Sequence, residues 1–196
     1  VLWPLFHYRL DLVNFRQEFL DGYRRVNEKF AEAVLPFLRP DDTIWVHDYH
    51  LIPLAAELRR RGCRQRIGFF LHIPFPPPDL LAAAPDNEWL VACLFEYDLI
   101  GFQTEADLGN FRHYAAEQAG ATVGKDGTFR ADGHVSRAGA FPIGIDVDSF
   151  AEMASRASEE VAIDELRRKV LGRRQIIGVD RLDYSKGLPD RFKAFG

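Results

Sequence analysis

Residues 67–73 read IGFFLHI, an apolar run that ends in a histidine and is followed by PFPPP at residues 74–78. The run is short and rich in β-forming residues, and it has no polar side chain before its end. A strand of this kind is typical of a parallel sheet whose strands are buried on both faces. The prolines cannot extend a strand ladder, so they predict a rigid turn directly after it.

Two similar runs lie on either side, TIWVH at residues 43–47 and DLIGF at residues 98–102. The segments before, between and after them have the apolar spacing of helices with one buried face. Strands that alternate with helices indicate an α/β fold, in which a Rossmann-like parallel sheet is layered with helices. The expected helices cover residues 14–38, 52–61, 87–95 and 105–118.

The second part of the chain changes character and then returns to the same rhythm. Frequent glycines at residues 124–145 predict a small hairpin region. A helix is expected at 149–171, a buried strand at 175–181 and a helix from 188 onward. Residues 142–146 read as a linker. We therefore expect residues 1–143 to form most of a first Rossmann-like domain, and residues 144–196 to form the linker and the beginning of a second.

Composition excludes several classes of function. The chain of 196 residues has 29 acidic and 25 basic residues, a net charge of -4, which gives no reason to expect nucleic acid or an anionic membrane as partner. Two cysteines are too few for a disulfide framework or a zinc knuckle. No run approaches ~20 apolar residues and no signal peptide is evident, which predicts a cytoplasmic protein. The missing initiator methionine favours a truncated fragment of a longer protein.

Polar residues follow all three apolar runs. Asp48 and His50 follow the first, His72 ends the second, and Gln103 and Thr104 follow the third. Ligands of open parallel sheets bind in the crevice beyond the carboxyl ends of the strands. The sequence therefore predicts a ligand site where these side chains converge.

Some of these residues have a second interpretation. His47, Asp48 and His50 have ligand types that suit a metal, but a hydrogen-bonded loop explains them as well. His72 fits a buried core histidine as well as a functional one; its position before the prolines favours function.

Two further clusters have the side chains that a sugar phosphate needs. LWPLFHYR at residues 2–9 combines Trp3 with basic and hydroxyl groups, an apolar face for a sugar ring beside donors for a phosphate. VDRLDYSKG at residues 179–187 places Arg181 and Lys186 on either side of a turn, where both can reach one diphosphate. An ion pair between Arg181 and Asp183 is the alternative. Residues 151–196 have 10 basic and 8 acidic residues, so phosphate binding is easier to place in this part.

Six motifs in the chain resemble those of trehalose-6-phosphate synthases, in the same order. The motifs are LWPLFHYR, WVHDYHL, GFFLHIPFP, DLIGFQTEAD, FPIGIDVDSF and VDRLDYSKGLP, which together extend over essentially the whole chain. The resemblance implies a retaining glycosyltransferase of the GT-B architecture, with two Rossmann-like domains that face each other. It also implies transfer of glucose from UDP-glucose, or another NDP-glucose, to glucose 6-phosphate, with no metal and no cofactor.

The resemblance also implies roles for five residues. Asp48 and Trp3 are expected to contact the acceptor glucose 6-phosphate, and His72 the donor glucose near the bond that breaks. Arg181 and Lys186 are expected to hold the donor diphosphate and stabilise charge on the leaving UDP. Asp48, His72, Arg181 and Lys186 are the catalytic candidates, in a front-face substitution that needs no protein nucleophile.

Several alternatives stay open at this point. A sister transferase with another acceptor, such as glycerol 3-phosphate, has the same fold, and a non-catalytic paralogue binds sugar phosphate without transfer. The nucleotide base and a possible homo-oligomer are also undetermined. The family's glycine-containing phosphate loop is expected upstream of Val1 and its acidic nucleotide-sugar residues downstream of Gly196, so we expect the chain alone to be inactive.

Overall fold

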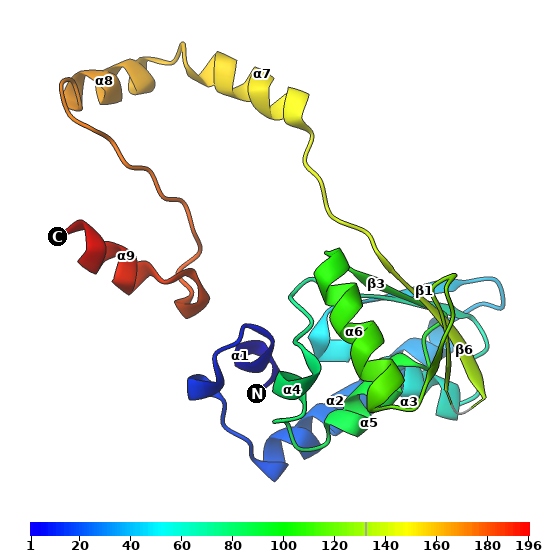
Figure 1. Ribbon diagram of the computed structural model, residues 1–196. Coiled ribbons are helices and arrows are strands. Elements are labelled where there is room, and N and C mark those ends of the chain that lie inside the picture. The colour runs from blue at the N-terminus through cyan, green and yellow to red at the C-terminus, as the bar shows by residue number, and fades with distance from the viewer. Residues whose placement is uncertain (132) are drawn as a thin grey trace. The chain divides into compact units, whose positions relative to one another are not determined.

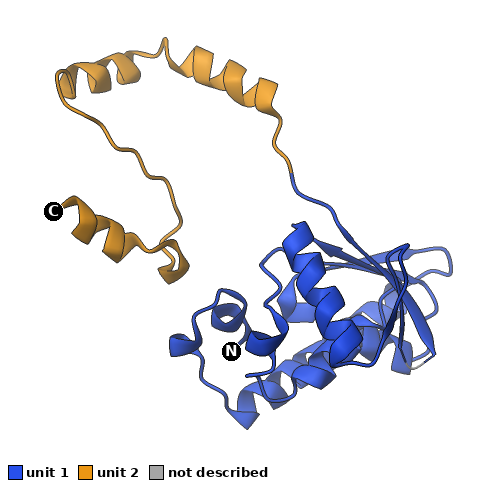
Figure 2. Cartoon of the chain, viewed as in Figure 1, with its two compact units in different colours: residues 1–143 blue, residues 144–196 orange. Residues whose placement is uncertain are grey.

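The computed structural model describes residues 1–131 and 133–196, and the chain divides into two units. Unit 1 comprises Val1–Ile143 and unit 2 comprises Gly144–Gly196 (Figure 2). Each unit is described by itself. Which substrate each unit binds stays a prediction.

A six-stranded sheet forms the centre of unit 1, in the order β1-β2-β3-β6-β5-β4 (Figure 1). Its first four members are parallel, which confirms the α/β class. They are β1 (Thr43–His47), β2 (Arg66–Phe70), β3 (Leu99–Phe102) and β6 (His134–Ala140). The antiparallel strands β5 (Thr128–Ala131) and β4 (Thr122–Val123) complete the far edge.

The predicted hairpin region is part of this main sheet. β5 and β6 pair in antiparallel fashion, as a hairpin requires. β6 also pairs in parallel with β3, where Arg137–Ala140 lie opposite Leu99–Phe102. The strand therefore has a ladder on each side, and the carboxyl end of β6 lies at the same edge as those of β1, β2 and β3.

The four helices that the sequence predicts in unit 1 are present, with ends that differ by a few residues, whereas the two short helices at Leu2–Phe6 and Pro78–Leu81 were not predicted. α6 begins after Thr104, whose hydroxyl oxygen accepts a hydrogen bond from the backbone N–H of Asp107 at 3.1 Å. Such a cap satisfies one of the free amides of the first helical turn. The helices are α1 (Leu2–Phe6), α2 (Gln17–Val34), α3 (Leu54–Arg60), α4 (Pro78–Leu81), α5 (Asn87–Leu94) and α6 (Glu105–Glu117), with 3-10 turns η1 (Leu10–Leu12), η2 (Leu35–Phe37) and η3 (Tyr49–Leu51).

Described helices cover only one face of the sheet, so the expectation of strands buried on both faces is wrong for this chain. Ile67, Phe69 and Phe102 are buried among the helices, where Phe102 meets Phe111 of α6 at 5.2 Å between ring centroids. On the opposite face Trp45 is 67% exposed. Successive side chains of a strand point to opposite faces of the sheet, and these runs are apolar on both faces. The sequence of a run therefore does not reveal which face the helices of this chain cover.

Unit 2 has helices and, among its described residues, no strand. The expected helix at 149–171 is two helices, separated at residues 158–160. The predicted buried strand at 175–181 is absent, and Ile176, Ile177 and Val179 are at least 76% exposed. A parallel strand needs a neighbouring strand for its hydrogen bonds, and the described residues of unit 2 do not provide one. The elements are α7 (Val147–Ala157), α8 (Val161–Lys169), η4 (Tyr184–Lys186) and α9 (Leu188–Phe195).

None of the described helices combines the length and the apolar character that a membrane crossing requires.

Candidate active site at the carboxyl edge of the sheet

Asp48 and His72, which follow adjacent strands, are in direct contact. The backbone N–H of Asp48 donates to the carbonyl oxygen of Phe70 at 2.8 Å, which continues the ladder past the end of β1. The Asp48 carboxylate then accepts a hydrogen bond from the backbone N–H of His72, with 3.3 Å between Oδ1 and N. The sheet edge thus brings together two of the predicted site residues.

Asp48 has an unusual backbone conformation, with φ 70° and ψ 164°. This region is almost restricted to glycine, and a residue with a side chain pays about 1–3 kcal/mol to occupy it. Its backbone is held from both sides, because its carbonyl oxygen also accepts from the N–H of Leu51 at 3.1 Å. Strain of this kind persists where surrounding contacts enforce it, and it occurs often at functional sites.

Two tyrosines hold the turn η3, which follows Asp48; Tyr97 is buried and Tyr23 is partly buried. The Tyr23 hydroxyl donates to the carbonyl oxygen of Tyr49 at 2.5 Å. The Tyr97 hydroxyl lies 2.8 Å from the carbonyl oxygen of Leu51 and 3.1 Å from that of Ile52. Burial raises the pKa of both phenols above their usual value, so both remain protonated donors. The turn is therefore fixed from the protein interior.

The segment after His72 is fixed by the first turns of α6. The backbone N–H of Phe75 donates to the Asp107 carboxylate at 2.9 Å, and its carbonyl oxygen accepts from the Asn110 amide at 2.9 Å. The Thr104 hydroxyl donates to the other oxygen of Asp107 at 2.6 Å. Thr104 thus positions this segment through Asp107, a buried residue that the sequence did not single out.

Gln103 also has a partner within the protein. Its side-chain carbonyl oxygen accepts from the backbone N–H of Ile143 at 3.0 Å, at the last residue of unit 1. Gln103 and Thr104 were expected at the ligand edge; the structure gives both side chains hydrogen bonds that hold the loops around it.

His47 is joined to the site through its ring. Its Nδ1 lies 2.9 Å from Nε2 of His72. Among the residues that the structure describes, no group of three or more His, Cys, Asp or Glu side chains has an arrangement that could hold a metal ion. The ring of His47 is instead half of a histidine pair.

Trp3 lies beside the turn that follows Asp48. Its ring centroid is 6.0 Å from that of Tyr49 and 4.0 Å from that of His7. His7 is held in turn, with its Nδ1 at 2.8 Å from the carbonyl oxygen of Trp3. Trp3 is half-buried, so part of its apolar face remains open to a ligand.

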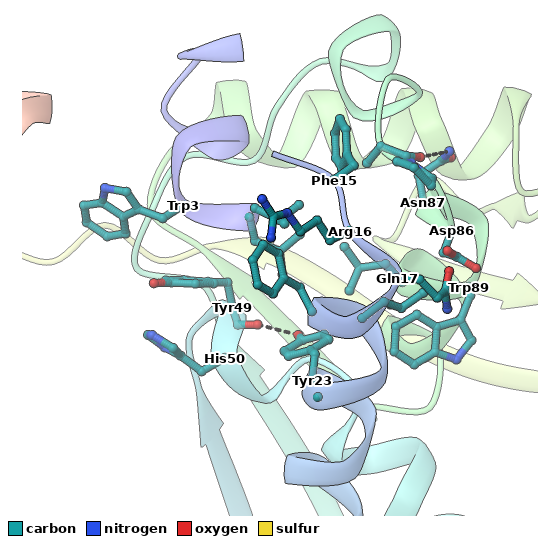
Figure 3. Close-up of a pocket in the computed structure, with 18 of the residues that line it drawn as sticks. Trp3, Phe15, Arg16, Gln17, Tyr23, Tyr49, His50, Asp86, Asn87 and Trp89 are labelled. Carbon is teal, nitrogen blue, oxygen red and sulfur yellow. Dashed lines mark hydrogen bonds between the residues drawn. The ribbon is translucent and has the colours of Figure 1, made fainter. Parts of the chain in front are cut away.

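A hollow of about 650 Å³ extends from Trp3 along α2 (Figure 3). Trp3, Tyr49 and His50 lie at one end of it, and Asp86, Asn87 and Trp89 lie at the other. Figure 3 also shows the bond from Tyr23 to Tyr49 on its wall. The lining residues do not include Asp48 or His72, so the hollow adjoins the histidine and aspartate pair without containing it.

Arg181 and Lys186 lie in unit 2, near the turn η4. Both are exposed, and Lys186 is the last residue of that turn. The Asp183 carboxylate shapes the turn by accepting from the backbone N–H of Ser185 at 2.8 Å. Gly187, at φ 60°, is the N-cap of α9. The two cations therefore flank a capped turn that leads into a helix N-terminus.

Comparison with known proteins places these observations in a family. The family model for glycosyltransferase family 20 matches residues 1–196. A trehalose-6-phosphate synthase of Cronobacter sakazakii is 49% identical over 195 residues, and one of Sinorhizobium fredii is 48% identical. These matches cover the whole of this chain but 41% and 42% of those proteins. The chain thus spans about two fifths of the length of these relatives.

Solved structures agree with the sequence matches. An alpha,alpha-trehalose-phosphate synthase (UDP-forming) from Burkholderia xenovorans, in complex with glucose-6-phosphate, matches with a TM-score of 0.93 and 47% identity. An E. coli structure described as trehalose-6-phosphate bound with UDP-2-fluoro glucose matches with a TM-score of 0.90 and 46% identity. Each match covers all of this chain, and 44% and 43% of the two matched chains.

Proposed function

The chain belongs to glycosyltransferase family 20, and on that premise we propose that its parent protein makes trehalose 6-phosphate from UDP-glucose and glucose 6-phosphate. The observation that carries the proposal is the contact between Asp48 and His72 at the carboxyl edge of the parallel sheet. This edge is where open α/β sheets bind their ligands. The match to solved trehalose-phosphate synthase structures supports the GT-B architecture for the parent protein.

The acceptor side of the site consists of Asp48 and Trp3. A carboxylate accepts hydrogen bonds from sugar hydroxyls, and an indole offers its apolar face to the sugar ring. Tyr49 links the two residues, because it follows Asp48 in the chain and its ring neighbours that of Trp3. The Burkholderia xenovorans relative, which was solved in complex with glucose-6-phosphate, supports this acceptor over glycerol 3-phosphate.

Three residues are proposed, each on its own chemistry, to contact the donor. His72 contacts the donor glucose. Arg181 binds the diphosphate through its planar guanidinium, and Lys186 through its ammonium charge. The positive end of the helix dipole at the start of α9, after Gly187, favours the same anion.

The reaction is a front-face substitution with retention. The acceptor hydroxyl attacks the anomeric carbon from the side on which UDP leaves. The new C–O bond forms as the bond to the diphosphate breaks, and the hydroxyl proton passes to the departing diphosphate oxygen on the same side. No protein nucleophile is needed. The work of the protein is to orient both substrates and to stabilise the charge that develops on the diphosphate.

The chain by itself is expected to be inactive, because it spans about two fifths of the length of its relatives and its unit 2 has only 53 residues, 144–196. We also propose that the parent protein is cytoplasmic and forms a homo-oligomer. The nucleotide base is proposed as uracil on the strength of the UDP-forming relative.

The full-length protein provides the test. Nucleotide release is measured from UDP-, ADP- and GDP-glucose, each with glucose 6-phosphate or glycerol 3-phosphate as acceptor. Release of UDP that requires glucose 6-phosphate supports the proposal. Release only with glycerol 3-phosphate indicates the sister activity. If none of the donor and acceptor combinations gives nucleotide release, the protein is a non-catalytic paralogue.

A further inference from the structure

The imidazole rings of His47 and His72 are directly joined, with 2.9 Å between Nδ1 of His47 and Nε2 of His72. His47 is the last residue of β1, and His72 lies two residues past the end of β2. A hydrogen bond between two imidazoles needs one nitrogen with a proton and one without. The contact therefore couples the protonation pattern of one ring to that of the other.

Aromatic neighbours on the same face of the sheet hold both rings. His47 lies opposite Phe70 in the parallel register, and Phe70 lies two residues before His72, so all three share a face. The Phe70 and His72 rings meet edge-on, with centroids 4.8 Å apart. On the other side, the Trp45 ring is 4.5 Å from that of His47.

Phe70 is itself fixed by a glycine of β3. Gly101 lies opposite Phe70 in register, and a Cβ at Gly101 would lie 2.6 Å from Cδ2 of the Phe70 ring. Phe70 is only 8% exposed, so its ring has little room to move away from this position. The absence of a side chain at Gly101 lets the Phe70 ring form a rigid wall beside the histidines.

We propose that His47 is a positioning residue that sets the orientation and the tautomer of the His72 imidazole. The inference rests on the proposed function, in which His72 contacts the donor glucose. With Nε2 of His72 engaged by His47, Nδ1 is the ring nitrogen that remains for a sugar hydroxyl. If Nε2 accepts, Nδ1 donates; if Nε2 donates, Nδ1 accepts. Either way the ring presents one defined group to the sugar.

Asp48 and His47 both position His72, one through its backbone and the other through its side chain. Asp48 holds the backbone N–H of His72, and His47 holds its ring. Two consecutive residues of the β1 end therefore fix one residue of the β2 end. A small displacement of a group that contacts a reacting substrate is enough to slow transfer substantially.

A spectroscopic test uses the full-length protein with ¹⁵N-labelled histidine and no substrate. Ring signals of His72, identified by their loss in His72→Asn, are expected to report one tautomer in the unmodified protein and a mixture in His47→Ala. His47→Asn places an amide near the position of Nδ1 that can pair with Nε2 of His72, so it is expected to restore the hydrogen bond and the fixed orientation of the ring. Unchanged His72 signals in His47→Ala overturn the proposal, whatever the activity.

A kinetic test separates positioning from a general loss of structure. In His47→Ala, kcat is expected to fall about 10-fold or more, while KM for glucose 6-phosphate stays within about twofold. His47→Asn recovers most of kcat. His113→Ala is the matched control, because His113 is a surface histidine of α6 paired with Glu117. Equal kcat in His47→Ala and the unmodified protein also overturns the proposal.

The two tests also separate this inference from the function on which it rests. If the unmodified full-length protein transfers no glucose to any acceptor, the proposed function is wrong. The ring signals of His72 in His47→Ala then decide by themselves whether His47 sets its tautomer.

Discussion

The carboxylate of Asp48 accepts a hydrogen bond from the backbone N–H of His72 at 3.3 Å, across the ends of β1 and β2. The residue proposed to bind the acceptor is thus bonded to the residue proposed to contact the donor sugar. A change in Asp48 is transmitted to His72 through a single hydrogen bond. This bond links the two proposed roles within unit 1.

The backbone strain at Asp48 gives a prediction about stability. Replacement by alanine keeps a side chain at φ 70°, whereas glycine adopts this conformation without strain. Glycine has more conformational entropy than alanine in the unfolded chain, and this entropy offsets part of the stability gained from the relief of strain. Asp48→Gly should therefore be more stable than Asp48→Ala by about 1 kcal/mol in urea unfolding of the full-length protein. Equal stability of the two variants would show that the site is unstrained.

Tyr97 is expected to be essential for the turn that follows Asp48. Tyr97→Phe removes the hydroxyl that bonds to the carbonyl oxygens of Leu51 and Ile52 and leaves these acceptors without that donor. Removal of the hydrogen-bond partner of a buried polar group lowers the free energy of unfolding by about 1–3 kcal/mol. Tyr23→Phe, which removes the bond to Tyr49, serves as the companion variant. If both variants unfold at the same urea concentration as the unmodified protein, the hydroxyls do not fix the turn.

Alkaline pH should destabilise unit 1 through Cys93. Burial raises the pKa of the Cys93 thiol from 9.0 to about 12. As the pH rises, the thiol loses its proton in the unfolded chain before it does so in the folded protein. The contribution of Cys93 to stability is therefore intact below about pH 9 and declines as the pH rises toward 12. Cys93→Ala should flatten this part of the stability profile, measured by urea unfolding at pH 8 to 11. The same slope in Cys93→Ala and the unmodified protein would assign the effect to other groups.

Lys186 is predicted to contribute to donor binding. Its ammonium group is proposed to contact the diphosphate, and a hydrogen bond to a charged group contributes about 1.5–3 kcal/mol. Lys186→Ala should weaken UDP-glucose binding to the full-length protein by about 10-fold or more, measured by calorimetry. Lys193→Ala is the matched control, because Lys193 is an exposed lysine of the same unit that lies in α9 and not in η4. Unchanged affinity in Lys186→Ala would remove Lys186 from the site.

Much of unit 1 follows from local patterns in the sequence. Strand β1 occupies Thr43–His47 as predicted, because a short run of β-forming residues is bounded by Asp41-Asp42 on one side and polar residues on the other. The meeting of Asp48 and His72 also follows, since carboxyl ends of parallel neighbours share an edge.

The sequence did not reveal features that depend on partners far along the chain. Tyr97 bonds to a carbonyl oxygen 46 residues away, and Asp107 bonds to Phe75 across 32 residues. No local spacing marks a buried tyrosine or aspartate as a support for a distant loop. The strand expected at 175–181 failed for a related reason, because a strand forms only where another strand can pair with it.

Product formation by the full-length protein and by Arg181→Ala tests the central claim most directly. UDP-glucose and glucose 6-phosphate are supplied to both, and the product and its anomeric configuration are followed by NMR, with Arg174→Ala as an exposed arginine control from the same unit. The account predicts an α,α-linked product and a rate about 100-fold or more lower in Arg181→Ala, the scale of losing one preorganised donor. An Arg181→Ala rate equal to that of the unmodified protein, or no product from glucose 6-phosphate, would contradict it.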